Sequence, residues 1–99
     1  MFLAKVVGSV WATKKTDNLN NLKFLIVHPV NLKKEPQTDV VIVADVLGAG
    51  MGETVICAYG HAARKAIQPD HPAGLSIEAA VVAIVDKLDV DESQLKKME

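Results

Sequence analysis

The sequence contains a single cysteine, Cys57, and only four aromatic residues among its 99 positions. One cysteine excludes an intrachain disulfide framework and is typical of a reducing compartment, so we expect a cytoplasmic protein. No apolar run approaches the roughly 18 residues of a membrane-spanning helix, so we predict no membrane partner. The net charge is −1, which excludes an overall basic field that would attract nucleic acid.

The apolar residues that are present are mostly small and branched. Hydrophobic residues make up 49% of the chain, and Val, Ala, Leu and Ile dominate them. These residue types suit pleated, tightly packed surfaces. A chain of 99 residues has room for one domain. The composition therefore favours a single small β domain.

Hydrophobic periodicity indicates a series of strands in the first part of the chain. Residues 3–13 alternate between an apolar face and a mixed face, as a half-exposed strand does. Further strands are predicted over 23–30, 40–46 and 54–59, separated by polar or glycine-rich segments. Pro29 marks the end or an exposed edge of the second strand.

Residues 76–88 fit two different structures. Their apolar side chains recur at i, i+3 and i+4 spacing behind Ser76, which stands in an N-cap position, and this pattern predicts a helix. The run over 81–85 is also rich in β-branched residues, which is typical of a buried strand. Periodicity alone does not decide between the two for so short a run.

The third and fourth predicted strands are apolar on both faces. No Lys or Arg lies between Lys34 and Arg64, and only Asp45 and Glu53 carry charge within residues 40–60. Strands of this kind usually have both faces covered, and the chain has too few helical segments to cover them. Apolar patches of that size favour aggregation when they are exposed. We therefore predict an obligate oligomer in which neighbouring subunits cover the second face.

The segment between these two strands is rich in glycine, with Gly48, Gly50 and Gly52 in five residues. The spacing matches neither the dinucleotide-binding fingerprint nor the Walker pattern, and no helix is predicted to begin at Glu53 and bind an anion. We interpret these glycines as positions that need a positive φ angle or a close backbone approach. We expect this requirement at Gly50 in particular.

The sequence offers no catalytic or metal-binding pattern. The histidines are too far apart to form a metal motif, at His28, His61 and His71. Cys57 has no second cysteine to support a zinc site and is interpreted as a buried, inert thiol. Asp45 and Asp86 lie in apolar runs, where a carboxylate more often caps a loop than acts as a catalyst. We predict no catalytic residue, no metal site and no cofactor.

Several short motifs follow one another along the chain. They are residues 4–13 (AKVVGSVWAT), Leu19 with 23–27 (KFLIV), 44–53 (ADVLGAGMGE), the turn 60–64 (GHAAR) and 79–86 (AAVVAIVD). Their ordered combination resembles the pentameric vertex proteins of bacterial microcompartments, which include carboxysomes and the shells for ethanolamine and propanediol utilisation. The resemblance covers residues 1–90, which we predict to be one vertex β-barrel domain, followed by a polar C-terminal tail over 91–99.

The resemblance implies a mainly β fold, a small OB-like closed barrel with one or two short helical turns. It assigns a helical turn to 76–79 and a strand to 81–88. It further implies a structural protein without enzymatic activity that forms homopentamers at the five-fold vertices of a microcompartment shell. The implied partners are the chain itself and hexameric shell proteins, with no nucleic acid and no membrane.

The resemblance also implies sites. It places one loop near the centre of the ring, formed by Gly48, Ala49, Gly50, Met51 and Gly52. At the subunit interface we predict Asp45, Gly60, His61 and Arg64. The planar guanidinium of Arg64 suits carboxylate or carbonyl acceptors better than a lysine would.

Three features depart from the family pattern. His61 stands where the family usually has serine, the loop over 65–77 is longer than usual, and the tail after Val90 has no counterpart to align. The main alternative is an OB-like binding module for a small ligand or single-stranded nucleic acid. Such modules use aromatic platforms and a basic groove. The lysines here are scattered, and Trp11 is expected to pack at an interface or on the barrel wall.

Overall fold

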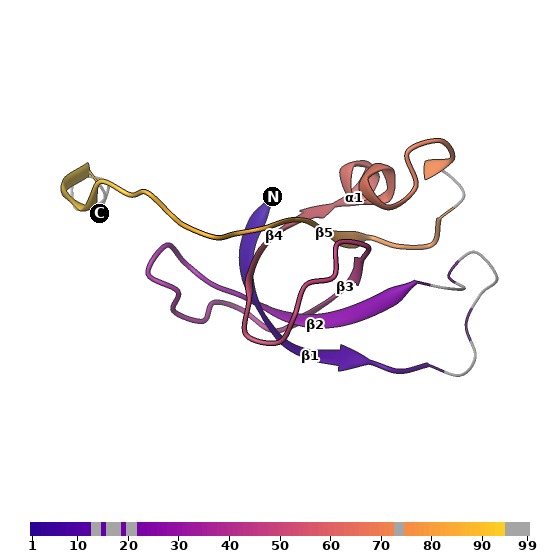
Figure 1. Ribbon diagram of the computed structural model, residues 1–99, viewed down its shortest axis with the longest axis horizontal. Helices are drawn as coiled ribbons and strands as arrows, with labels where there is room; N and C mark the ends of the chain where they lie inside the picture. Colours follow the sequence, from indigo (N-terminus) through magenta and orange to yellow (C-terminus); the bar gives the residue numbers. More distant parts are fainter. Residues whose placement is uncertain (13–14, 16–18, 20–21, 73–74, 95–99) are drawn as a thin grey trace.

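The computed structural model describes residues 1–12, 15, 19, 22–72 and 75–94 (Figure 1). In chain order the elements are β1 (Phe2–Val10), β2 (Lys23–Pro29), β3 (Val41–Asp45), β4 (Thr54–Tyr59), α1 (Gly60–Ile67) and β5 (Ala79–Ile84). The predicted strand over 54–59 is confirmed at both ends. The three earlier strands are confirmed with shorter bounds, and Thr13, where the first was expected to end, lies outside the described residues.

The strands close into a barrel in the order β1-β2-β3-β5-β4, with β4 paired back to β1. All neighbours are antiparallel except β3 and β5, which are parallel. β1 pairs with β4 through its first half and with β2 from Ala4 to Val10. A register shift lies between Val6 and Gly8, within the pairing with β2 and just beyond the end of the pairing with β4, and such irregularities bend a strand. This architecture confirms the predicted OB-like closed barrel.

The barrel interior is filled by small side chains from every strand. Alternate residues of a strand face the same side of a sheet, so each strand contributes its inward set. The cluster consists of Ala4, Val6, Leu25, Val27, Val43, Ala49, Val55, Cys57, Ala79 and Val81. Burying a valine side chain contributes roughly 1.5–3 kcal/mol, so these valines are a main source of stability.

A second apolar cluster lies outside the barrel wall, between the strands and α1. Figure 1 shows α1 beside β4 and β5. Ala44, Ala58 and Ala80, from β3, β4 and β5, pack there with the fully buried Ala63 of α1. The small alanines allow the helix to approach the strands closely. We expected the chain to lack a helix that covers the second face of its apolar strands. This is wrong around Ala44 of β3 and Ala58 of β4, where α1 covers that face.

The structure corrects the helical assignments around this cluster. The predicted helical turn over 76–79 is wrong, because these residues lead into β5, which spans Ala79–Ile84 instead of 81–88. A helix over 76–88 is wrong for the same reason: the segment fills the gap between β3 and β4 and closes the barrel. The helix instead occupies Gly60–Ile67, where a turn over 60–64 and the start of a loop over 65–77 were predicted. Its alanines, Arg and Lys are strong helix formers.

The chain leaves the barrel after β5. Val85 donates its N–H to the carbonyl of Thr54 at 2.9 Å, and no later described residue has a hydrogen bond to the barrel. The chain then runs away from the barrel without forming a further β-strand and ends in a short helical turn over 92–94 (Figure 1). This segment contributes to the elongated shape, which measures 48 × 25 × 22 Å. Residues 95–99 of the predicted tail lie outside the described residues.

Candidate assembly surface

The outer wall of the barrel carries large apolar side chains that the chain does not cover. On β3, Val43 faces the core, whereas its neighbour Ile42 is 58% exposed. The exposed set also includes Val7, Val40, Val46, Leu47, Met51 and Tyr59. Single exposed apolar residues are normal, but several from the same β3–β4 region mark an interaction surface. This surface supports the predicted need for neighbouring subunits beyond the part that α1 covers.

Asp45 organises the glycine loop that follows β3. Its carboxylate is 3% exposed and accepts three backbone N–H bonds. The donors are Leu47 at 2.9 Å, Gly48 at 3.2 Å and Ala49 at 2.9 Å. Charge-assisted bonds of this kind are stronger than neutral ones. A buried aspartate at the end of β3 therefore acts as an internal cap, which is the role the sequence favoured over catalysis.

The far end of the loop is anchored to β1. Gly52 donates its N–H to the carbonyl of Val6 at 2.9 Å, and the N–H of Val6 donates to the carbonyl of Glu53, also at 2.9 Å. The Glu53 carboxylate in turn accepts the N–H of Gly50. Leu47 and Met51 remain exposed on this rigid loop, at 50% and 68%. The loop is thus a fixed platform that presents apolar side chains outward.

Two of the three loop glycines adopt a positive φ. Gly48 has a φ of 85° and Gly52 a φ of 84°, whereas Gly50 has no positive φ. The expectation for Gly50 is therefore wrong as regards positive φ. A Cβ at Gly50 would instead lie 3.1 Å from the Glu53 carboxylate, which supports the alternative of close packing.

Two of the predicted interface residues meet at the start of β5. Gly60, with a φ of 62°, donates its N–H to the carbonyl of Glu78 at 2.8 Å. The Arg64 guanidinium donates to the carbonyl of Ile77 at 3.3 Å and lies 3.5 Å from the Glu78 carboxylate. Arg64 thus ties α1 to the segment before β5 within the same chain. His61 is exposed on α1.

These contacts define what the predicted interface residues do within one subunit. Asp45 is buried and bonded within the chain, whereas Arg64 bonds within the chain through Nη1 but keeps 26% of its side chain exposed, and His61 is exposed. Their position at a subunit interface stays a prediction, as does the position of residues 48–52 near the ring centre. The exposed apolar wall was visible in the sequence as two-faced strands, but the loop anchoring through Glu53 was not.

The thiol of Cys57 is held in an unreactive setting. Cys57 is fully buried, and burial, with a smaller contribution from the Asp45 carboxylate, raises the pKa of its thiol to about 12. The His28 ring nitrogen Nε2 lies 2.9 Å from the carbonyl of Thr38. Within the described residues no three His, Cys, Asp or Glu side chains are grouped to hold a metal. No helix in the described part of the chain has the length and apolarity to cross a bilayer.

Comparison with known proteins gives consistent results. A family model described as ethanolamine utilisation protein EutN/carboxysome matches residues 1–86. The microcompartment shell vertex protein GrpN of Rhodospirillum rubrum is 40% identical over 89 residues, which cover 90% of this chain and 97% of GrpN. The carboxysome shell vertex protein CcmL of Synechocystis is 41% identical over 96 residues, which cover 96% of this chain and 92% of CcmL.

The fold agrees with solved structures of such proteins. The GrpN pentameric microcompartment shell protein from Rhodospirillum rubrum superposes with a TM-score of 0.81 at 37% identity, covering 92% of this chain and all of that chain. These matches confirm the resemblance and the predicted location in a microcompartment shell. The chain belongs to the EutN/CcmL family of microcompartment shell vertex proteins.

Proposed function

We propose that the chain assembles into a homopentameric ring that closes a five-fold vertex of a microcompartment shell. The observation that carries the proposal is the uncovered apolar wall around β3, including Val40, Ile42 and Val46. A relative of 37% identity whose fold superposes on this chain is described as pentameric. A head-to-tail interface whose rotation closes after five copies gives a ring without free apolar edges.

We further propose how the subunit contributes to that ring. The wall around Ile42 packs against the neighbouring subunit, with Arg64 and His61 of α1 at its border. The loop over 48–52 lies near the ring centre. Its internal hydrogen bonds maintain its conformation where the loops of five copies pack close together. The exposed Met51 supports this placement, because an apolar side chain on a rigid loop gains most from contact with its symmetry copies.

The partners outside the ring follow from geometry. A flat layer of hexagonal tiles cannot close into a polyhedron unless five-fold units occupy its corners. We therefore propose that the ring docks against hexameric shell proteins, and that it acts by shape alone, without catalysis or cofactor. The role of Asp45 as a loop cap and the burial of Cys57 support a structural role, because neither group is presented to a substrate.

Native mass spectrometry tests the ring directly. We expect a pentamer for the unmodified chain and smaller species for Ile42→Asp, because a charge placed in a desolvated interface is costly. Lys33→Asp, on the exposed loop between β2 and β3, is the matched control and leaves the pentamer unchanged. A stable monomer of the unmodified chain would contradict the proposal.

Co-expression with a hexameric shell protein tests the vertex role. We expect closed particles when both proteins are present, and open sheets or tubes when the vertex protein is left out. Electron microscopy and retention of an enclosed dye distinguish these outcomes. Equally closed shells without it, in the absence of a second vertex protein, would contradict the proposal. Salt-sensitive binding of single-stranded DNA by the isolated protein would favour the alternative binding module.

A further inference from the structure

The end of β1 that lies opposite the C-terminal segment forms an apolar hollow with a fully exposed tryptophan. Trp11, the only tryptophan of the chain, is 94% exposed. It lines an open hollow of about 370 Å³. The hollow is also lined by the apolar residues Val10, Leu22 and Phe24 and by two lysines, Lys15 and Lys23. Of the two positions expected for Trp11, the barrel wall is therefore wrong and an interface stays a prediction, and its large apolar surface is left without cover in the single subunit.

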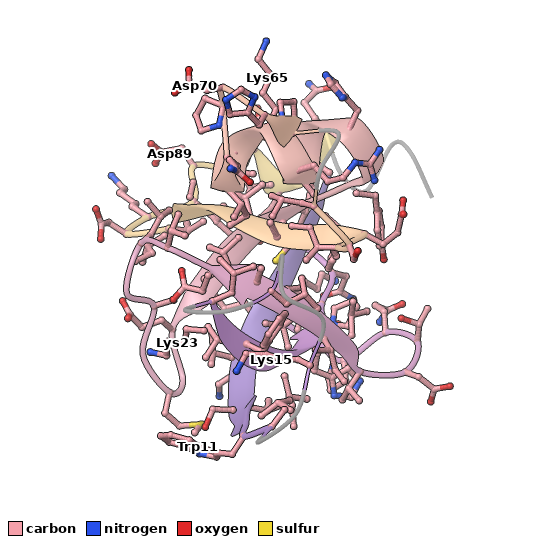
Figure 2. All side chains as sticks on the ribbon, turned by 90° about the vertical axis from the view of Figure 1, so that its right-hand side faces the viewer. Trp11, Lys15, Lys23, Lys65, Asp70 and Asp89 are labelled. Carbon is pink, nitrogen blue, oxygen red and sulfur yellow. The ribbon has the colours of Figure 1, made fainter. Side chains whose placement is uncertain are left out.

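Figure 2 shows this end of the molecule from the right-hand side of Figure 1. Trp11 projects at the lower edge, and Lys15 and Lys23 lie above it. The lysines give the rim of an apolar hollow a positive charge. Such a site fits an occupant with apolar side chains and flanking carboxylates.

The same end of β1 has a free edge. The pairing of β1 with β4 stops at Lys5, and the backbone groups of Val6 bond to Glu53 and Gly52. Beyond Val6, this edge of β1 has no partner within the described part of the chain, although the other edge pairs with β2 as far as Val10. An unpaired strand edge beside an apolar hollow accepts an extended segment by strand addition.

The C-terminal segment over residues 86–92 has the matching properties. It runs away from the barrel as far as Asp91, Glu92 begins the helical turn, and its backbone makes no hydrogen bond to its own barrel within the described residues. Leu88 and Val90 are its apolar residues, and at a strand spacing of two they share one face. The segment contains four carboxylates and one lysine, so its net charge opposes that of the hollow.

The two features lie at opposite ends of the molecule. β5 carries the C-terminal segment away from the end at which β1 terminates (Figure 1). A head-to-tail ring brings opposite sides of adjacent copies together, and this arrangement allows the segment of one copy to reach the hollow of another. The family model ends at residue 86, the first residue of this segment, so residues 87–92 lie beyond the part of the chain that it matches.

We propose that residues 86–92 of one copy dock in extended form on the free edge of β1 of the neighbouring copy, with Leu88 and Val90 in the hollow beside Trp11. The carboxylates of the segment then lie near Lys15 and Lys23. The proposal rests on the ring described under the proposed function, and it makes the segment a strap that links adjacent subunits.

Crosslinking in the full-length chain tests the contact. Ser9 lines the hollow and Val90 lies in the strap, and both are exposed in the single subunit. The double variant Ser9→Cys with Val90→Cys, treated with a short thiol crosslinker, should give a ladder of linked chains on a denaturing gel. Cys57 is buried and does not compete. Ser9→Cys with Lys33→Cys is the matched control and should give no ladder.

Crosslinking within one chain, or no crosslinking above the control, would overturn the proposal. The emission of Trp11 gives an independent measurement. In the assembled ring it should lie at shorter wavelength than in the variant Leu88→Ser with Val90→Ser, because the strap no longer covers the indole. The control Leu32→Ser, an exposed apolar residue outside the strap, should keep the emission of the unmodified chain.

Native mass spectrometry of the same samples distinguishes failure of the strap to dock from failure of the pentamer to form. If the unmodified chain is pentameric but its Trp11 emission equals that of the strap variant, the docking is wrong and the proposed function stands. If the unmodified chain is monomeric, both are wrong. A pentamer with interchain crosslinks and a strap-dependent emission is the expected result.

Discussion

The glycine loop between β3 and β4 and the segment after β5 make an informative comparison. Both are irregular, both follow a barrel strand, and both carry exposed apolar side chains. The loop is tied down by the carboxylates of Asp45 and Glu53 and by hydrogen bonds to Val6 of β1. Within the described residues, the hydrogen bonds and ion pairs of the segment after Val85 are local, such as the Lys87–Asp89 pair at 3.3 Å. The hydrogen bonds that hold the loop are complete within one subunit. The segment after β5 gains its partners only from a neighbouring subunit, in the docking proposed above.

Removal of the Asp45 carboxylate from the loop should lower the free energy of unfolding more than substitutions at the glycines, Arg64 or Cys57. Asp45→Ala leaves three loop N–H groups without their acceptor, and each buried unsatisfied group costs about 1–3 kcal/mol. We expect a loss of roughly 3 kcal/mol or more in the free energy of unfolding, measured by urea denaturation. The control Asp89→Ala, in the exposed segment, should change stability by less than about 0.5 kcal/mol. Equal effects of the two variants would contradict the contrast between loop and segment.

Alanine substitutions should rank the three loop glycines. Gly48→Ala and Gly52→Ala force a side chain into a left-handed backbone, which costs about 1–2 kcal/mol per residue. Gly50→Ala should cost less, because its new Cβ meets only the movable end of the Glu53 side chain. Thermal unfolding of the three variants measures the order. A Gly50→Ala variant that is the least stable of the three would show that the close approach outweighs backbone strain.

Arg64 should have a smaller effect on the fold. Arg64→Ala removes one hydrogen bond to the Ile77 carbonyl and a pair with the largely exposed Glu78, so we expect a loss of about 1 kcal/mol. Arg64→Lys should lose less. Unfolding of the protomer and dissociation of the ring are measured separately. If ring dissociation changes far more than unfolding, Arg64 acts at the subunit interface as the sequence predicts.

Cys57 should give the smallest and most selective effect. Its thiol pKa is raised from 9.0 to about 12, so the folded chain keeps the proton that the unfolded chain loses. The resulting contribution is fully present below pH 9 and is lost as the pH rises from 9 to about 12. Stability measured across this range should fall less steeply in Cys57→Ala. Identical slopes would contradict the burial of a neutral thiol, as would rapid alkylation of the folded protein at neutral pH.

The strands and the loop were largely predictable from particular residues. Alternation predicted the strands of the first part of the chain, and β4 was predicted at both ends because a glycine-rich loop and Gly60 bracket it. The role of Asp45 as a cap followed from its place near the end of an apolar strand. The motif over 44–53 also contributed to the family resemblance, which the comparisons confirm.

Other features were not predictable in the same way. The motif over 60–64 predicts a turn and residues 65–77 a loop, whereas Gly60–Ile67 form a helix that packs Ala63 over the outer alanines of the barrel. The i, i+3 and i+4 pattern in 76–88 is real, but it places apolar residues on both faces of a strand that has core on one side and α1 on the other. Local sequence carries no information on either contact.

The sequence by itself determined the small β domain, the capped glycine loop, the apolar strands and the family. These depend on local propensity, on short-range hydrogen bonds and on the order of motifs. Only the tertiary structure decided which segment closes the barrel, which outer face α1 covers, that Trp11 stands exposed, and that the chain leaves the barrel after Val85. Each of these depends on contacts between residues distant in the chain, because burial and strand pairing are shared among elements and are not properties of any one of them.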